Sequence, residues 1–227
     1  MIVSVHQPQY LAWVGYFHKI LKSDVFVFLD DVQYKEREYQ NRNRIRTKNK
    51  AQWLTVPVLN SKERFIKIKE VYIDNSQGWA GKHWKALYLN YNRSPFFKEY
   101  ADFFQDLYNQ KWDRLLDLNI YIIKGINKIL NIDKVIYLES ELEIENTKTA
   151  RIIDICKKLG ADTYLSGIGG KAYLEEGLFT AAGLKLQYQQ FKHPEYSQCF
   201  APFIPNLSMV DLLFNCGPKT AAIISNC

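Results

Sequence analysis

Two patterns of hydrophobic and polar positions alternate along the chain. Residues 2–5 (IVSV) and 25–29 (VFVFL) are short, continuous apolar runs, typical of strands that are buried on both faces of a parallel sheet. Between them, residues 12–21 carry apolar side chains at helical spacing. Because parallel neighbours need a crossover connection, this order predicts a strand-helix-strand unit.

The same order returns in the second half of the chain. Residues 135–138 (VIYL) predict a strand, residues 150–159 an amphipathic helix, and residues 163–166 (TYLS) another strand. Residues 184–191 alternate apolar and polar positions, which favours an edge strand, and residues 206–217 predict a short capped helix. The expected fold class is α/β, with a mostly parallel sheet and flanking helices in a Rossmann-like three-layer arrangement.

The middle of the chain has a different pattern. Residues 53–59 (WLTVPVL) and 65–73 (FIKIKEVYI) alternate with period two around residues 60–62, which predicts a pair of strands. Helical spacing follows over residues 79–89, 96–108 and 112–130.

No internal repeat interrupts the chain, and no linker rich in proline, glycine or serine. The sequence therefore predicts a single α/β domain over residues 1–227, in which residues 79–131 form a helical insertion or subdomain.

Composition narrows the class of partner. The formal net charge is +6, yet lysine and arginine are spread along the 227 residues without a long basic run. Nucleic acid is disfavoured, since no nucleic-acid motif is present and the aromatic residues fall on predicted core faces. We expect a small-molecule partner, either phosphorylated or a sugar.

Cysteine usage and hydropathy indicate the compartment. The four cysteines form no CxxC pair and no zinc-type spacing, so no metal site is predicted. The first thirty residues lack a signal-peptide pattern, and no run of about 18 apolar residues exists. We expect a cytoplasmic protein without a membrane span.

Polar residues follow the predicted strands. In open parallel sheets, ligands bind beyond the carboxyl ends of the strands, so these residues predict a crevice. The alternative is ordinary strand-end polarity. The residues are His6-Gln7, Asp30-Asp31, Glu139-Ser140, Ser166-Gly167 and, after the last strand, His193.

His6 is the first candidate for acid-base chemistry. Its imidazole is followed by Gln7, Tyr10 and Trp13 on a loop that opens a helix, which favours a ligand-binding loop. The alternative is a turn histidine that bonds a nearby carbonyl.

Asp30 and Asp31 are the second candidates. Alternation predicts that one of them points into the crevice, where a carboxylate can hold an amine or a sugar hydroxyl, or Mg²⁺. A helix or turn cap is the alternative.

A polar cluster comes next in the chain. Two arginines separated by one residue favour binding of a phosphate or carboxylate. A solvated basic turn is the alternative. The cluster comprises Gln33, Asn41, Arg42, Asn43 and Arg44.

The segment from Ser166 to Lys171 contains three glycines, which expose backbone amides to an anion. Its spacing is neither a Walker motif nor a dinucleotide fingerprint, so the sequence assigns no cofactor.

Several of these residues also carry a family resemblance. The matching segments are His6-Gln7-Pro8-x-Tyr10-Leu11-x-Trp13-x-Gly15-Tyr16-Phe17-x-Lys19-Ile20, Asp30-Asp31-Val32-Gln33, Asn41-Arg42-Asn43, Tyr164-Leu165-Ser166-Gly167, His193-Pro194-x-Tyr196-x-Gln198 and Leu207-Ser208-x-x-Asp211-Leu212. Over nearly its whole length the chain resembles the WbqC-like protein family. It departs at Ala12, where the family usually carries proline, and this change affects the stiffness of the turn.

The resemblance implies a pathway. Members are associated with bacterial surface-polysaccharide gene sets, including those for the O-antigen of lipopolysaccharide, so we expect a role in making or decorating a nucleotide-sugar precursor. The expected activity is a transferase that acylates or aminoacylates an activated amino sugar or a related acceptor. The alternatives are a non-catalytic ligand-binding or scaffold protein of the same pathway, and a nucleotidyltransferase-like enzyme.

The expected mechanism assigns roles to the candidate residues. His6 is the general base, and Asp30 or Asp31 orients it or holds the acceptor. Arg42 and Arg44 clamp a diphosphate, and the amides of residues 167–170 steady a phosphate or a developing oxyanion.

Overall fold

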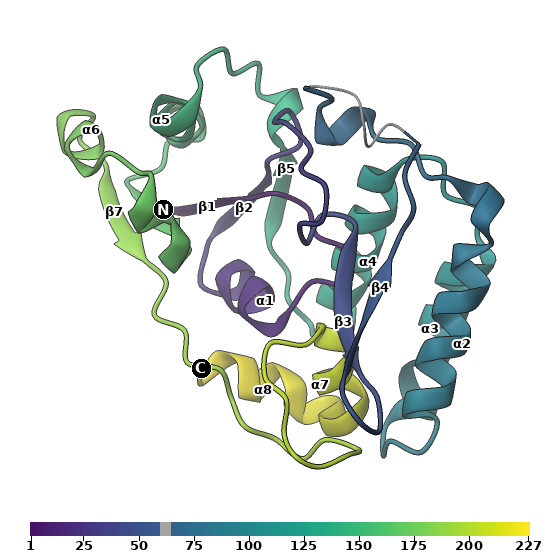
Figure 1. Ribbon diagram of the computed structural model, residues 1–227. Coiled ribbons are helices and arrows are strands. Elements are labelled where there is room, and N and C mark those ends of the chain that lie inside the picture. The colour runs from purple at the N-terminus through teal and green to yellow at the C-terminus, as the bar shows by residue number, and fades with distance from the viewer. Residues whose placement is uncertain (60–64) are drawn as a thin grey trace.

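A five-stranded parallel sheet organises the molecule. The computed structural model describes residues 1–59 and 65–227, and in it the strands run in the order β5-β2-β1-β6-β7 (Figure 1). Every neighbouring pair in this sheet is parallel, which confirms the predicted fold class. The strands are β1 (Ile2–His6), β2 (Val25–Phe28), β5 (Val135–Leu138), β6 (Thr163–Ser166) and β7 (Lys185–Tyr188).

The strand order changes direction at β1. The chain moves outward from β1 to β2 and then to β5, and it returns to the other side of β1 with β6 and β7. A topological switch point therefore lies between β1 and β6. At such a point the connections leave in opposite directions, so a crevice opens beyond the carboxyl ends of the two strands.

The two faces of the sheet carry different cores. Val25 and Val27 belong to a core that includes α5 (Lys148–Lys158) and α6 (Glu176–Ala181). Phe26 and Phe28, which alternate with them, belong to a larger core on the other face. Helices on both faces explain why these strands are continuously apolar.

Helices supply the larger core. Residues of α1 and α4 pack there together with aromatic residues of α2, α3 and α7, and in Figure 1 α2 and α3 lie side by side beyond the hairpin. All the helices predicted from sequence are confirmed, with small shifts at their ends. They are α1 (Val14–Leu21), α2 (Trp79–Tyr91), α3 (Phe97–Asn109), α4 (Leu115–Ile129), α5 and α7 (Met209–Cys216). The short helix α8 (Thr220–Ser225) was not predicted.

The predicted strand pair of residues 53–59 and 65–73 is wrong. β4 (Ala51–Thr55) pairs instead with β3 (Arg42–Arg46), in an antiparallel hairpin. Residues 65–73 contain a short 3-10 turn (Ile68–Glu70), and the two predicted segments meet only at one isolated antiparallel bridge, between Val58 and Ile73. The predicted turn at residues 60–62 lies outside the described residues.

Buried polar contacts explain why β3 does not have a hydrophobic strand pattern. Asn43 donates from its side-chain amide to the Leu11 carbonyl, at 2.8 Å. Tyr91 accepts a hydrogen bond from the Arg46 backbone N–H, at 2.7 Å.

Across residues 1–59 and 65–227, no helix combines the length and the apolar character that a membrane crossing requires.

Candidate functional site

Two cavities open at the carboxyl edge of the sheet, beside the switch point. We name the first the basic cavity; its volume is about 710 Å³, and its lining includes Lys35, Lys148, Arg151 and Tyr173. We name the second the aromatic cavity; its volume is about 550 Å³. Its lining includes Trp13, Tyr16, Gln189, Phe191, His193 and Asn206.

The two cavities meet at a small set of shared residues. His6, Lys19, Gly167 and Gly169 line both of them. A ligand in either cavity therefore contacts the same two ionisable side chains. Since His6 ends β1 and Gly167 follows β6, the junction lies at the switch point that the strand order defines.

His6 presents a lone pair at this junction. Its Nδ1 donates to the Gln7 carbonyl at 3.0 Å, because a carbonyl can only accept, and so Nε2 is the acceptor nitrogen of the neutral ring. Burial, assisted by the positive charge of Lys19, lowers the pKa of His6 from 6.5 to about 3. The imidazole is therefore neutral at physiological pH.

Lys19 is the second ionisable group of the junction. Helix α1 packs it against the sheet, where it is 3% exposed, and its Nζ donates to the Val5 carbonyl at 2.9 Å. Burial lowers the pKa of Lys19 from 10.5 to about 7. A large fraction of this amine is uncharged at neutral pH and can act as a base or a nucleophile.

Sequence reasoning missed Lys19. It named the residue only as part of the family motif and proposed no chemistry for it. The available signal was its position between Phe17 and Ile20, both fully buried on the same short helix. A lysine on an apolar helix face usually extends its amine to the surface, so a lysine whose amine is buried there is a candidate functional residue.

A glycine-rich turn forms the wall between the cavities. Ser166 donates from its hydroxyl to the Gly167 carbonyl at 3.0 Å, and a 3-10 turn (Ile168–Ala172) follows. At Gly170 a Cβ atom would lie 2.1 Å from the Ser166 hydroxyl, so only glycine fits. The first N–H groups of a helical turn have no partner within the turn, so they are available to a ligand.

The N-terminus of α5 faces the basic cavity. Thr147, Lys148 and Arg151 line it, and the first turn of α5 contains no acidic residue. Free N–H groups and the helix dipole favour an anion at this position. Arg151 is held in place by Glu139 at 2.9 Å and by the Asp31 carbonyl at 3.1 Å.

Asp31 lines the basic cavity but is already paired. Its carboxylate accepts from Lys67 at 2.8 Å and also from Lys69. Burial raises the pKa of Asp31, but the hydrogen bonds and charges of the two lysines outweigh burial and lower it. Within the described residues, no three His, Cys, Asp or Glu side chains gather in a way that would hold a metal ion.

Asp30 lies outside both cavities. It is 1% exposed, and its carboxylate accepts from the Ser140 backbone N–H at 3.0 Å and from the Ser140 hydroxyl at 2.6 Å. These bonds join the end of β2 to the end of β5. Asp30 therefore links two strand ends and lines neither cavity.

The arginine pair also lines neither cavity. Arg42 lies over the Trp53 ring, 4.4 Å from its centroid, and Arg44 lies 5.6 Å from the same centroid. Arg44 also donates to the Asn206 carbonyl at 3.2 Å. Both guanidinium groups thus support the hairpin and do not line the basic cavity.

The remaining predicted residues also divide into those that line a cavity and those that do not. Gln7 and Gln33 line the basic cavity. Asn41 and Asn43 donate to backbone carbonyls in the core, at 2.9 and 2.8 Å. Tyr10 is fully buried, and its hydroxyl lies 2.8 Å from His83 Nδ1. Three of these five therefore lie outside the cavities.

His193 is a wall of the aromatic cavity. Its Nδ1 donates to the Pro194 carbonyl at 2.8 Å, and its Nε2 accepts from the Asn206 backbone N–H at 3.0 Å. With both nitrogens occupied, His193 has no free site for proton transfer. Phe191 packs edge-on against Trp13 in the same wall, with ring centroids 5.2 Å apart.

Comparison with known proteins supplies a family. The sequence model described as the WbqC-like protein family matches residues 7–223 of the chain. The chain is 33% identical over 227 residues to the uncharacterized protein Rv1507c of Mycobacterium tuberculosis (strain ATCC 25618 / H37Rv), an alignment that covers 99% of this chain and 98% of that protein. No solved structure matches the chain.

Proposed function

Because the chain belongs to the WbqC-like protein family, we propose that it is a transferase of bacterial surface-polysaccharide biosynthesis, which moves an acyl or aminoacyl group onto the amine of an activated amino sugar. The family resemblance supplies the pathway. One observation carries the proposed activity: two bases, the partly buried His6 and the buried Lys19, lie where two cavities meet. A transfer reaction needs such a junction, since donor and acceptor must reach each other.

The two cavities suit different parts of the reactants. In the basic cavity, the N-terminus of α5 and the side chain of Lys148 favour the diphosphate of a nucleotide sugar. The sugar then extends to the junction. In the aromatic cavity, Trp13 and Phe191 offer apolar surface to the carbon skeleton of the donor.

The pKa values favour Lys19 as the general base in place of His6. A catalytic base works best when its pKa is near the working pH, and the pKa of Lys19 is about 7 whereas that of His6 is about 3. Neutral His6 accepts a hydrogen bond from the acceptor amine through Nε2 and orients it.

The proposed step moves the acyl group from its donor to the sugar amine. The sugar amine forms a C–N bond to the acyl carbon, the bond between that carbon and its leaving group breaks, and the amine proton passes to Lys19 Nζ. Lys19 then returns the proton to the leaving group. Backbone N–H groups of residues 167–169 stabilise the oxyanion that develops on the acyl oxygen, whereas the Gly170 N–H donates to the Gly167 carbonyl at 2.9 Å.

The test is an activity screen with matched variants. The purified protein is incubated with UDP- and dTDP-linked amino sugars together with acyl-CoA and aminoacyl donors, and the mass of the sugar product is measured. We expect Lys19→Met to lower the rate by at least about 100-fold. The dissociation constant of the nucleotide sugar should change little, since the basic cavity keeps its other residues.

Lys22→Met is the control, because Lys22 lies on the same helix and donates only to the Ser225 carbonyl at 3.2 Å. Equal rates in the Lys19→Met and Lys22→Met variants would contradict the assigned base. Nucleotide-sugar binding without any modified product across the donors would instead favour the ligand-binding alternative.

A further inference from the structure

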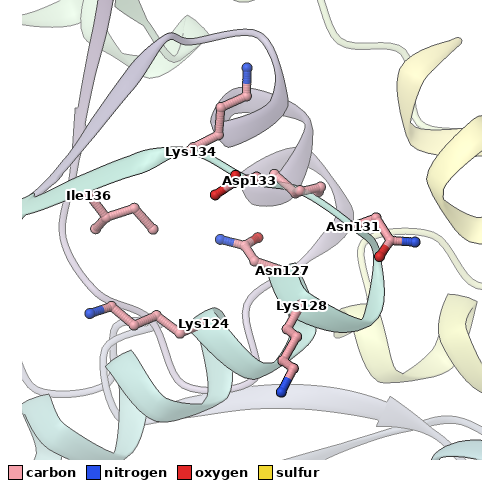
Figure 2. A pocket seen from close by; sticks show the side chains of 8 residues that line it. Lys124, Asn127, Lys128, Asn131, Asp133, Lys134 and Ile136 are labelled. Atoms are coloured by element: carbon pink, nitrogen blue, oxygen red, sulfur yellow. The ribbon is translucent and has the colours of Figure 1, made fainter.

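A third cavity lies at the opposite edge of the sheet (Figure 2). Its volume is about 510 Å³, and it is formed by the C-terminal half of α4 and the chain that enters β5. Since all five strands are parallel, the start of β5 and the carboxyl ends near His6 are at opposite edges of the sheet. This cavity is therefore separate from the two cavities of the proposed transferase site.

Asn127 is the unusual residue of this cavity. It is 4% exposed, yet neither its side-chain nitrogen nor its side-chain oxygen has a hydrogen-bond partner among the residues that the structure describes. Figure 2 shows its amide directed into the space between α4 and the segment that carries Asp133 and Lys134. A buried amide without partners is costly, so such a group calls for an explanation.

Two other helical asparagines bond their side-chain NH₂ groups within their own helix. Asn90 donates to the carbonyl of Ala86 at 2.8 Å, and Asn215 donates to the carbonyl of Asp211 at 2.7 Å. Asn127 has a carbonyl four residues earlier, on Ile123, but forms no bond with it. Its side chain is directed to the cavity instead.

Positive charge surrounds Asn127. Lys124, Lys128 and Lys134 line the cavity, against one acidic residue, Asp133. Among the described residues none of these three lysines forms an ion pair. The local charge favours an anion.

The C-terminus of α4 does not cancel this preference. Helix C-termini carry partial negative charge on their free carbonyls. In this helix the carbonyls of Ile126, Asn127 and Lys128 accept from the N–H groups of residues 130, 132 and 131, at 2.9, 2.9 and 3.2 Å. These carbonyls are therefore satisfied within the turn.

We propose that this cavity is a second ligand site, which binds a small organic phosphate such as a sugar phosphate. The Asn127 amide donates to the phosphate and accepts from a hydroxyl of the organic part, and Lys124 and Lys134 neutralise the charge. Ile132 and Ile136 supply an apolar wall against the carbon skeleton.

The test is a titration of the full-length protein with glucose 1-phosphate, followed by the NMR signal of the Asn127 side-chain amide; glucose is the uncharged control. We expect a saturating shift with glucose 1-phosphate and none with glucose. Lys124→Met and Lys134→Met should each weaken binding about threefold. Asn127→Leu should weaken it more than about tenfold while the melting temperature is kept or raised, since the variant removes an unpaired buried amide.

Two control variants locate the site. Lys85→Met changes a lysine of α2 that does not line the cavity, and Lys148→Met changes the basic cavity; both should bind glucose 1-phosphate like the unmodified protein. An Asn127 amide that does not shift in millimolar glucose 1-phosphate would overturn the proposal. Binding that is weakened in Lys148→Met would do the same, because it would place the phosphate in the basic cavity.

Discussion

The buried charge of Lys19 destabilises the folded state, and we propose this residue as the base of the transfer reaction. The drop of its pKa from 10.5 to about 7 corresponds to a penalty of at most about 5 kcal/mol for the charged form. We therefore predict that Lys19→Met removes activity and raises stability. Loss of the bond to the Val5 carbonyl offsets about 1 kcal/mol of this gain.

The stability that Lys19→Met gains over the unmodified protein should decrease as pH rises. Between pH 7 and 10.5 the unfolded chain binds a proton at Lys19 that the folded chain does not, so the native protein gains stability as pH rises through this window. The advantage of Lys19→Met should be largest below pH 7 and disappear toward pH 10.5. Melting curves at pH 6 and pH 10 check this, and an equal advantage at both would contradict the buried charge.

Asp211 stabilises the C-terminal part of the protein. Its buried carboxylate accepts hydrogen bonds from Tyr91, Tyr196 and Gln198, each at 2.8 Å. We predict that Asp211→Asn costs about 3 kcal/mol, because it weakens three bonds to a charged acceptor and directs an NH₂ group at a donor. The melting temperature should fall by roughly 6–12 °C, whereas Tyr196→Phe should lower it only by about 3 °C. Equal effects of the two substitutions would contradict this account.

At the level of residues, the sequence predicts what depends on nearby positions. His6 follows an apolar strand, and so its place at the sheet edge follows from the pattern. The alternation at Asp30 and Asp31 predicts that one of them points into the crevice. Which one depends on distant partners, because Ser140 holds Asp30 and Lys67 holds Asp31. The burial of Lys19 likewise depends on packing against the whole sheet.

At the level of elements, the sequence predicted phosphate binding by Arg42 and Arg44 of the hairpin, whereas we propose that the N-terminus of α5 binds the phosphate. The guanidinium of Arg42 is engaged with Trp53, whereas Lys148 begins α5 at the basic cavity. We predict that Lys148→Met raises the dissociation constant of a nucleotide sugar about threefold to fivefold. Arg42→Met should leave it unchanged. Isothermal titration checks both, and the reverse ranking would favour the diphosphate clamp expected from sequence.

The elements themselves were predicted where the apolar pattern alone decides the structure. β1, β2 and β5 are mostly apolar runs, β7 alternates, and the longer helices have helical spacing, so these elements were found. The six-residue helices α6 and α8 were not predicted. β3 was missed because its polar side chains bond to the backbone of other segments, as Asn43 does to Leu11. Such a strand lacks the alternation that marks a half-buried strand.

At the level of the whole molecule, residues 189–208 join the sheet to the C-terminal helices without regular structure. Gln189 donates to the Gly15 carbonyl at 2.8 Å at one end of this segment, and the Ser208 backbone N–H donates to the Arg44 carbonyl at 2.9 Å at the other. Pro202 accepts from Arg46 at 2.9 Å between them. No periodicity marks such a segment, so sequence could not place it over α1.

Residues of this segment complete the wall of the aromatic cavity. Phe191 closes the cavity against Trp13, whereas Phe203, on the same segment, packs on Tyr196 and does not line the cavity. We predict that Phe191→Ala raises the KM for the acyl or aminoacyl donor about tenfold, with a smaller effect on kcat, because the lost ring contacts the donor before and during transfer. Phe203→Ala should lower only the melting temperature. Steady-state kinetics with each substrate varied in turn check this. If the KM for the nucleotide sugar rises instead, the donor and the acceptor occupy the opposite cavities from those we assign.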